Sequence, residues 1–159
     1  MDIIEEFKEL VMIDSASGKE RAIADTLTKK LRDLGFAVKE DRAGDTFGGD
    51  TGNLTAVREG TRPGAILFCS HMDRVAKGLS IHPQEKDGYL VSDGTTILAA
   101  DDVSGICAIL DGVRRAIASQ KPLPRLEIAF TVGEEAGLWG GRSLDRSQFP
   151  SPFCYVLYL

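Results

Sequence analysis

The feature that most constrains the fold of this 159-residue chain is the alternation of short apolar runs with segments of helical period. Residues 64–69 are almost continuously apolar, which is typical of a strand covered on both faces. Residues 103–117 then repeat apolar side chains at helical spacing, and residues 126–132 have the composition of another strand. This alternation predicts a three-layer α/β domain with a mixed, mainly parallel sheet.

The first third of the chain is expected to form two amphipathic helices. Residues 2–12 carry apolar side chains at helical spacing. Ser17 and Glu20 have the spacing of a capping box, which predicts that a second helix begins there and ends at Gly35. Further strands are expected at residues 36–38, 53–57, 89–92 and 96–98, the last two forming a hairpin around Asp93 and Gly94.

Composition and charge argue against several classes of function. The net charge of −5 at pH 7 disfavours binding to nucleic acid or to an anionic membrane surface, and no apolar run is long enough to span a bilayer. The N-terminus is acidic where a signal peptide would be basic, so export is not expected. Three widely spaced cysteines without a C-x-x-C pair indicate free thiols in a reducing compartment, and we expect a cytoplasmic protein.

Acidic residues, one of them close to a histidine, follow the predicted strands. Open α/β sheets gather their functional groups at strand ends, so these side chains are expected to share one edge of the sheet. Imidazole and carboxylate ligands suit a divalent metal, and the set is best suited to two zinc ions that share a carboxylate. The residues concerned are His71 and Asp73, Asp101 and Asp102, and Glu134 and Glu135.

Each of these segments also has a simpler interpretation. Asp73 could accept the second ring N–H of His71 and orient it as a ligand, but an isolated H-x-D is more often structural. Asp102 could be only a helix N-cap. In a glycine-rich turn, Glu135 and Glu134 could divide metal binding and proton abstraction, although an exposed Glu-Glu turn is usually neither. The conjunction of three acidic strand ends favours the metal site.

The same motifs resemble the M20 family of zinc peptidases, and most closely its peptidase T or tripeptidase branch. The matching stretches cover nearly the whole chain, and they are residues 51–54, 71–73, 92–102 and 133–138. The resemblance implies that His71 binds one zinc ion and that Asp73 orients the His71 ring. It implies that Glu135 binds the second zinc ion. It also implies that Asp101 bridges both ions, that Glu134 is the general base, and that the peptide bond between Asp101 and Asp102 is cis.

The chain departs from the family pattern in several places. Family members continue into a lid or dimerisation domain and then return to the catalytic sheet with another metal-binding histidine, so residues 1–159 are expected to be a partial M20-type catalytic domain without these parts. Tyr158 stands where a further acidic ligand is expected. Arg74 and Val103 replace a small polar residue and a lysine.

These observations predict a zinc-dependent aminopeptidase that acts on short peptides, or an inactive fragment of one. The alternatives are an M20 amidohydrolase that acts on N-acyl amino acids and a non-catalytic remnant, because substrate choice in this family depends mainly on the lid. The apolar segment 153–159 would present an open strand edge, which predicts association into a homo-oligomer.

Overall fold

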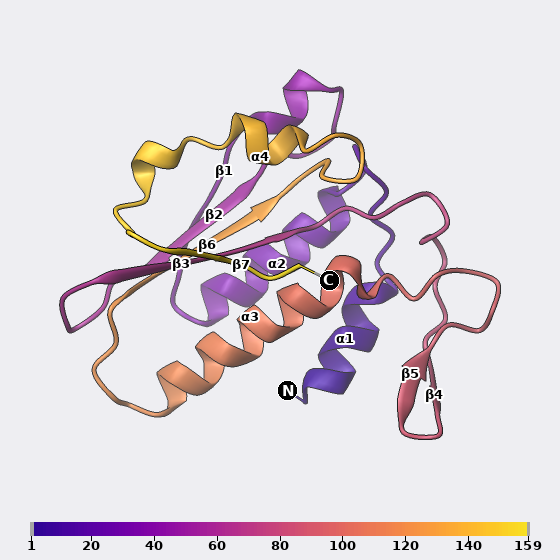
Figure 1. Cartoon of the computed structure of the whole chain (residues 1–159), viewed down its shortest axis with the longest axis horizontal. Helices are drawn as coiled ribbons and strands as arrows, with labels where there is room; N and C mark the ends of the chain where they lie inside the picture. The colour runs from indigo at the N-terminus through magenta and orange to yellow at the C-terminus, as the bar shows by residue number, and fades with distance from the viewer. Residues whose placement is uncertain (1, 159) are drawn as a thin grey trace.

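The computed structural model describes residues 2–158, and its centre is a five-stranded mixed sheet (Figure 1). The strands, in their spatial order, are β1 (Ala37–Glu40), β2 (Leu54–Arg58), β6 (Arg125–Thr131), β3 (Ala65–His71) and β7 (Cys154–Val156). β1 pairs with β2 and β2 with β6 in antiparallel fashion, whereas β6, β3 and β7 run parallel. The predicted mixed sheet is therefore confirmed, with its parallel part built from the two apolar runs and β7.

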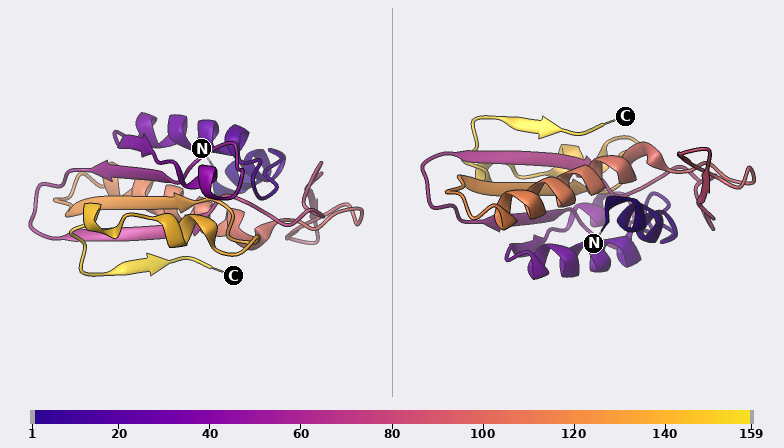
Figure 2. Two further views of the ribbon diagram at one scale, coloured as in Figure 1. Left: turned by 90° about the horizontal axis from the view of Figure 1, so that it is seen from above. Right: turned by 90° about the horizontal axis from the view of Figure 1, so that it is seen from below.

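Helices lie on both faces of this sheet (Figure 2). The large core lies between one sheet face and the helices α1 (Ile3–Val11), α2 (Arg21–Asp33) and α3 (Ala100–Ala118). The alternating side chains Leu126, Ile128 and Phe130 of β6 point into this core. The short helices α4 (Trp139–Ser143) and η2 (Arg146–Gln148) lie over the opposite face.

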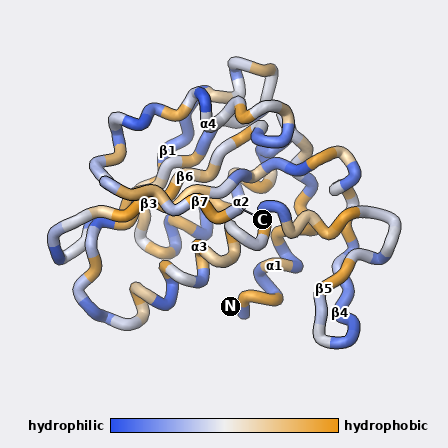
Figure 3. Tube along the Cα trace, viewed as in Figure 1, coloured by the Kyte–Doolittle hydropathy of each residue, from blue (hydrophilic) through white to orange (hydrophobic). Residues whose placement is uncertain are grey.

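The distribution of hydropathy along the chain agrees with this layering (Figure 3). Hydrophobic residues concentrate along the central strands, and polar residues concentrate in the loops at the periphery. No helix within residues 2–158 is both long enough and apolar enough to cross a bilayer.

The start of α2 differs from the capping-box prediction. The helix begins at Arg21, and the Glu20 side chain makes no capping bond. Instead, the Ser17 hydroxyl donates to Asp73, and the Glu20 carboxylate accepts a hydrogen bond from the amide of Gly133. The two side chains of the predicted capping box are therefore engaged by residues distant in sequence rather than by the free amides of the helix end.

A hairpin forms in this region, but around the preceding Asp-Gly pair, Asp87 and Gly88, instead of around Asp93 and Gly94. β4 (Gln84–Lys86) and β5 (Tyr89–Val91) are joined by Asp87 and Gly88, whose φ values of 52° and 82° suit a tight two-residue turn. Asp93 and Gly94 form no hairpin, because the Asp93 carboxylate accepts hydrogen bonds from the amide and hydroxyl of Thr95. The strand expected at residues 96–98 is accordingly absent from the described structure.

Candidate metal centre

Three segments that are distant in sequence meet at the carboxyl edge of the parallel strands. His71 is the last residue of β3 and lies in register with Thr131, the last residue of β6. The turn that carries Glu134 and Glu135 follows β6 directly, and Asp101 lies at the start of α3. Because β3 and β6 are parallel, their ends bring these side chains to one edge of the sheet.

The side chains of His71, Asp101 and Glu135 form a compact cluster. One ligand atom from each lies within 4.8 Å of the other two. The Nε2 atom of His71 is 3.0 Å from the Oδ1 atom of Asp101, and the ring is buried. One imidazole and two carboxylates form a donor set that fits a divalent cation such as zinc. The structure thus brings together the three residues that the sequence singled out as metal ligands.

The second ring nitrogen of His71 contacts the backbone of Asp73 more closely than its side chain. Nδ1 is 3.0 Å from the carbonyl oxygen of Asp73 and 3.4 Å from the Oδ1 atom of its carboxylate. Burial alone would lower the pKa of His71, but the carboxylates of Asp73 and Asp101 outweigh it and raise the pKa to about 9. The cluster therefore favours positive charge at its centre, whether a proton or a metal ion.

The Asp73 carboxylate mainly holds the glutamate turn. Its Oδ1 accepts the amide of Glu134 at 2.9 Å, and its Oδ2 accepts the amide of Glu135 at 3.1 Å and the hydroxyl of Ser17 at 2.5 Å. Burial alone would raise the pKa of Asp73, but its hydrogen-bond donors and the neighbouring His71 hold that pKa below the usual range. Asp73 is therefore a stable anion that fixes the backbone of both glutamates.

The two adjacent aspartates point to different partners. The peptide bond between Asp101 and Asp102 is cis, as the resemblance implies, and Asp101 faces His71. The Asp102 carboxylate accepts the hydroxyl of Ser70 at 2.5 Å and the amide of Gly105 at 3.2 Å. The bond to Gly105 follows the kink at Asp101 and Asp102 and resembles that of a helix N-cap, whereas Asp101 faces the metal cluster.

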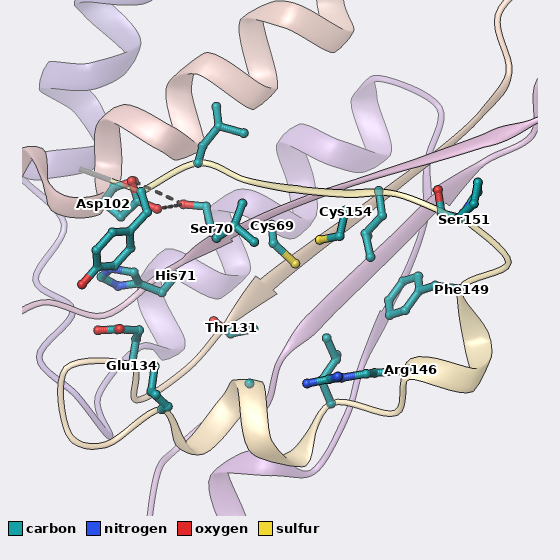
Figure 4. Close-up of a pocket in the computed structure, with 18 residues that line it drawn as sticks. Cys69, Ser70, His71, Asp102, Thr131, Glu134, Arg146, Phe149, Ser151 and Cys154 are labelled. Atoms are coloured by element: carbon teal, nitrogen blue, oxygen red, sulfur yellow. Dashed lines mark hydrogen bonds between the residues drawn. The ribbon is translucent and has the colours of Figure 1, made fainter.

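The glutamate turn separates its two side chains. Gly133, with a φ of 59°, begins the turn, and Glu135 joins the metal cluster. Glu134 instead lines a cavity and lies beside the His71 ring (Figure 4). Burial and the negative charge of Asp101 raise the pKa of Glu135. A cation in the cluster would offset this repulsion between carboxylates.

The cavity beside the cluster has a volume of about 620 Å³. Its polar end contains His71, Glu134, Asp102 and Tyr158, and the Tyr158 ring centroid is 6.0 Å from that of His71. The negative charges of Glu134 and Asp101 raise the pKa of Tyr158, so its hydroxyl stays protonated. The apolar wall is formed by Leu67, Leu138, Leu144, Phe149, Val156 and Leu157. This combination suits a small ligand with a polar group at the cluster and apolar groups along the wall.

Three residues outside the predicted ligand set support this site from a distance, and of these only Asn53 lies in a stretch, residues 51–54, that carries the family resemblance. Asn53 accepts the amide of Val132 at 3.1 Å and donates to the carbonyl of Gly140 at 3.0 Å, and so links both ends of the segment that contains the glutamate turn. Ser17 contacts Asp73, and Glu20 contacts Gly133. No local signal distinguishes these residues from a strand-entry asparagine or a helix cap.

Comparison with known proteins places this geometry among peptidases. The model of peptidase family M28 matches residues 53–154. The chain is 41% identical over 156 residues to the uncharacterized protein YqjE of Bacillus subtilis, a match that covers 98% of this chain and 42% of that protein. A peptidase T-like protein of Rhizobium meliloti is 28% identical, with 89% of this chain and 41% of that protein covered.

Two solved structures have nearly the same backbone. The aminopeptidase PepT from Bacillus cereus is 42% identical with a TM-score of 0.95, and the match covers 99% of this chain and 43% of that chain. A tripeptidase from Staphylococcus aureus is 36% identical with a TM-score of 0.94 and the same coverage. These matches confirm the expected α/β peptidase fold. The chain spans less than half the length of each of these relatives.

Proposed function

Because the chain belongs to peptidase family M28, we propose that it supplies metal-binding and proton-transfer groups of an exopeptidase that removes the first residue from short peptides. The convergence of His71, Asp101 and Glu135 at one edge of the sheet carries this proposal. The names of the similar proteins, peptidase T-like, aminopeptidase PepT and tripeptidase, support an aminopeptidase that acts on tripeptides. We further propose that the chain represents the peptidase T-like branch of the M20 family, which its motifs resemble, with residues 1–159 forming part of the catalytic domain.

Zinc is the cofactor that we propose for this site. His71, Asp101 and Glu135 would hold it, and with two ions Asp101 would be the shared carboxylate. When bound, zinc polarises a carbonyl group and lowers the pKa of water. Burial and then the negative charge of Asp101 raise the pKa of Glu135, and the carboxylates of Asp73 and Asp101 raise the pKa of His71, so the cluster contains negative charge that a cation would offset.

The chain's own residues would position the substrate and move the proton. The Glu134 carboxylate, at the polar end of the cavity, would accept a proton from the attacking water and deliver it to the leaving amine. The Asp73 carboxylate would keep Glu134 and Glu135 in place through their amides. The apolar wall of the cavity would bind side chains of the peptide and exclude water. We place this activity in the cytoplasm, since Cys69, Cys107 and Cys154 are free thiols.

The proposal is tested by titrating the purified chain with Co²⁺ and by assaying tripeptide hydrolysis with the same metal. His71→Ala should abolish specific Co²⁺ binding. Glu134→Gln should retain that binding and reduce turnover by at least about 100-fold, because a general base contributes that much to the rate. Glu59→Gln, which changes an exposed glutamate paired with Arg125, is the matched control and should leave both measurements unchanged.

Two outcomes would contradict the proposal. One is Co²⁺ affinity that is the same in the wild type and His71→Ala. The other is wild-type tripeptide turnover no higher than that of Glu134→Gln. An N-acyl amino acid, assayed in parallel, distinguishes a peptidase from an amidohydrolase with the same metal chemistry.

A further inference from the structure

The loop between α1 and α2 reaches the glutamate turn from the other end of the chain. We propose that Ser17 and Glu20 in this loop are positioning residues, which act on the metal centre by orienting Asp73 and Gly133. This inference rests on the proposed function, since it concerns the same metal centre. Ser17 contacts Asp73 from 56 positions away in the sequence, and Glu20 contacts Gly133 from 113 positions away.

Ser17 controls the rotation of the Asp73 carboxylate. Its hydroxyl donates to Oδ2, the same oxygen that accepts the amide of Glu135. The final torsion of an aspartate is broad, so the Ser17 hydroxyl adds a third contact that restricts the plane of the carboxylate beyond the two amides. Without the hydroxyl, Oδ2 keeps only its bond to the Glu135 amide at 3.1 Å, while Oδ1 stays bonded to the Glu134 amide at 2.9 Å, so the contact to Glu135 is the one that is weakened. The position of the Glu135 side chain in the cluster therefore depends on Ser17.

Glu20 fixes the point at which the chain leaves β6. Its Oε1 accepts the amide of Gly133 at 3.0 Å, and its side chain is fully buried. Gly133 has a φ of 59°, and an added Cβ would lie 2.8 Å from the Phe47 ring, so the backbone is closely packed on this side too. The Glu20 contact and this packing together define the direction in which Glu134 and Glu135 emerge.

The environment of Glu20 is unfavourable for a group that serves only as packing. Its second oxygen, Oε2, is buried and has no hydrogen-bond partner. Burial raises the pKa of Glu20, and the nearby negative charge of Asp73 raises it further. An apolar side chain of similar size would avoid this desolvation cost. What an apolar side chain cannot supply is the acceptor for the Gly133 amide, and that acceptor is the function we assign to Glu20.

The loop that carries Ser17 is itself anchored to the residue after Asp73. The buried Arg74 side chain donates to the hydroxyl of Ser15 at 3.0 Å and to the carbonyls of Val11 at 2.7 Å and Leu10 at 3.3 Å. The Arg74 amide also donates to the carbonyl of Ser15. These bonds fix the loop, and with it Ser17, relative to Asp73, as a positioning role requires.

The test measures Co²⁺ affinity and the visible absorption spectrum of the Co²⁺-bound chain. Ser17→Ala and Glu20→Ala should each weaken affinity by about 10- to 100-fold, as is usual when groups behind a metal ligand are removed. Both should also alter the spectrum, because Glu135 is displaced. Glu20→Gln should restore near-normal affinity, since its amide oxygen can still accept from Gly133. Ser119→Ala, which removes an exposed hydroxyl bonded to Ala116, is the control.

The outcomes separate this inference from the proposed function. If the wild type binds Co²⁺ specifically and folded Ser17→Ala and Glu20→Ala bind it within about twofold, only the positioning role is overturned. If the wild type binds no better than His71→Ala, the proposed function itself fails. Should Ser17→Ala not fold, Ser17→Thr and Ser17→Val provide the same comparison, because valine has a methyl group where threonine has its hydroxyl. Equal affinity and spectrum in that pair would also overturn the inference.

Discussion

Replacing Glu6 with glutamine should destabilise the fold more than any other single change of charge in α1. The Glu6 side chain is 1% exposed, and both of its oxygens lie 2.8 Å from the Nη2 atom of Arg114, while Lys30 approaches to 3.3 Å. This group joins α1, α2 and α3. Removing one partner of a buried ion pair typically costs about 3–5 kcal/mol. Arg114 and Lys30 are 26% and 14% exposed, so both can regain some solvent, and we expect about 2–3 kcal/mol.

Urea unfolding of Glu6→Gln and of Glu5→Gln measures this difference. Glu5 is the matched control, because its side chain is 66% exposed and pairs with Lys8 on the same helix, so its loss should change stability by less than about 1 kcal/mol. A double-mutant cycle with Arg114→Met should show coupling, since the two changes remove the same interaction. Equal unfolding free energies for the two glutamine variants would refute the reasoning.

Three further predictions follow from other parts of the structure. The pKa of His71 is raised to about 9, so the stabilisation from its charged form is complete below about pH 6.5 and is lost as the pH rises through 9. The difference in unfolding free energy between the metal-free wild type and His71→Ala should therefore fall by up to about 3 kcal/mol over this range, and a pH-independent difference in urea unfolding would contradict it. Gly140→Ala should destabilise by about 1–3 kcal/mol in the same assay, because its Cβ would lie 2.5 Å from the carbonyl oxygen of Val132, whereas Gly141→Ala, which meets nothing within 4 Å, should be neutral. β7 is an edge strand with Tyr155 and Val156 exposed, so light scattering should show concentration-dependent association that Tyr155→Lys reduces; a monomer at high concentration would argue against it.

The sheet and the metal cluster could be predicted because their signals are local and periodic. The apolar runs at residues 64–69 and 126–132 both form parallel strands, and the acidic segments that follow them meet as expected. Runs of this kind mark strands of the central sheet, although β6 also carries the buried Glu127 and β3 is only partly buried along most of its length. The residues that follow each strand then lie at the carboxyl edge of the sheet.

The parts that could not be predicted depend on tertiary competition. Ser17 and Glu20 match a helix cap as well as they match any other role, and only the folded chain shows that Asp73 and Gly133 engage them instead. Two Asp-Gly pairs lie within a short stretch, and local turn preference does not decide which forms the hairpin. The same holds for His71, whose nearer contact is the carbonyl of Asp73 rather than its carboxylate.

The parallel register that places His71 beside Thr131 also links metal affinity to folding. The three ligands lie at positions 71, 101 and 135, so an unfolded chain would have to close two long loops to bring them together. The unfolded chain therefore offers no comparable site, and a cation that binds this cluster selects the native state alone. Metal at 100 times its dissociation constant would then add about 2.7 kcal/mol to the unfolding free energy. The shift of the melting temperature with metal concentration thus becomes a measure of affinity that needs no substrate.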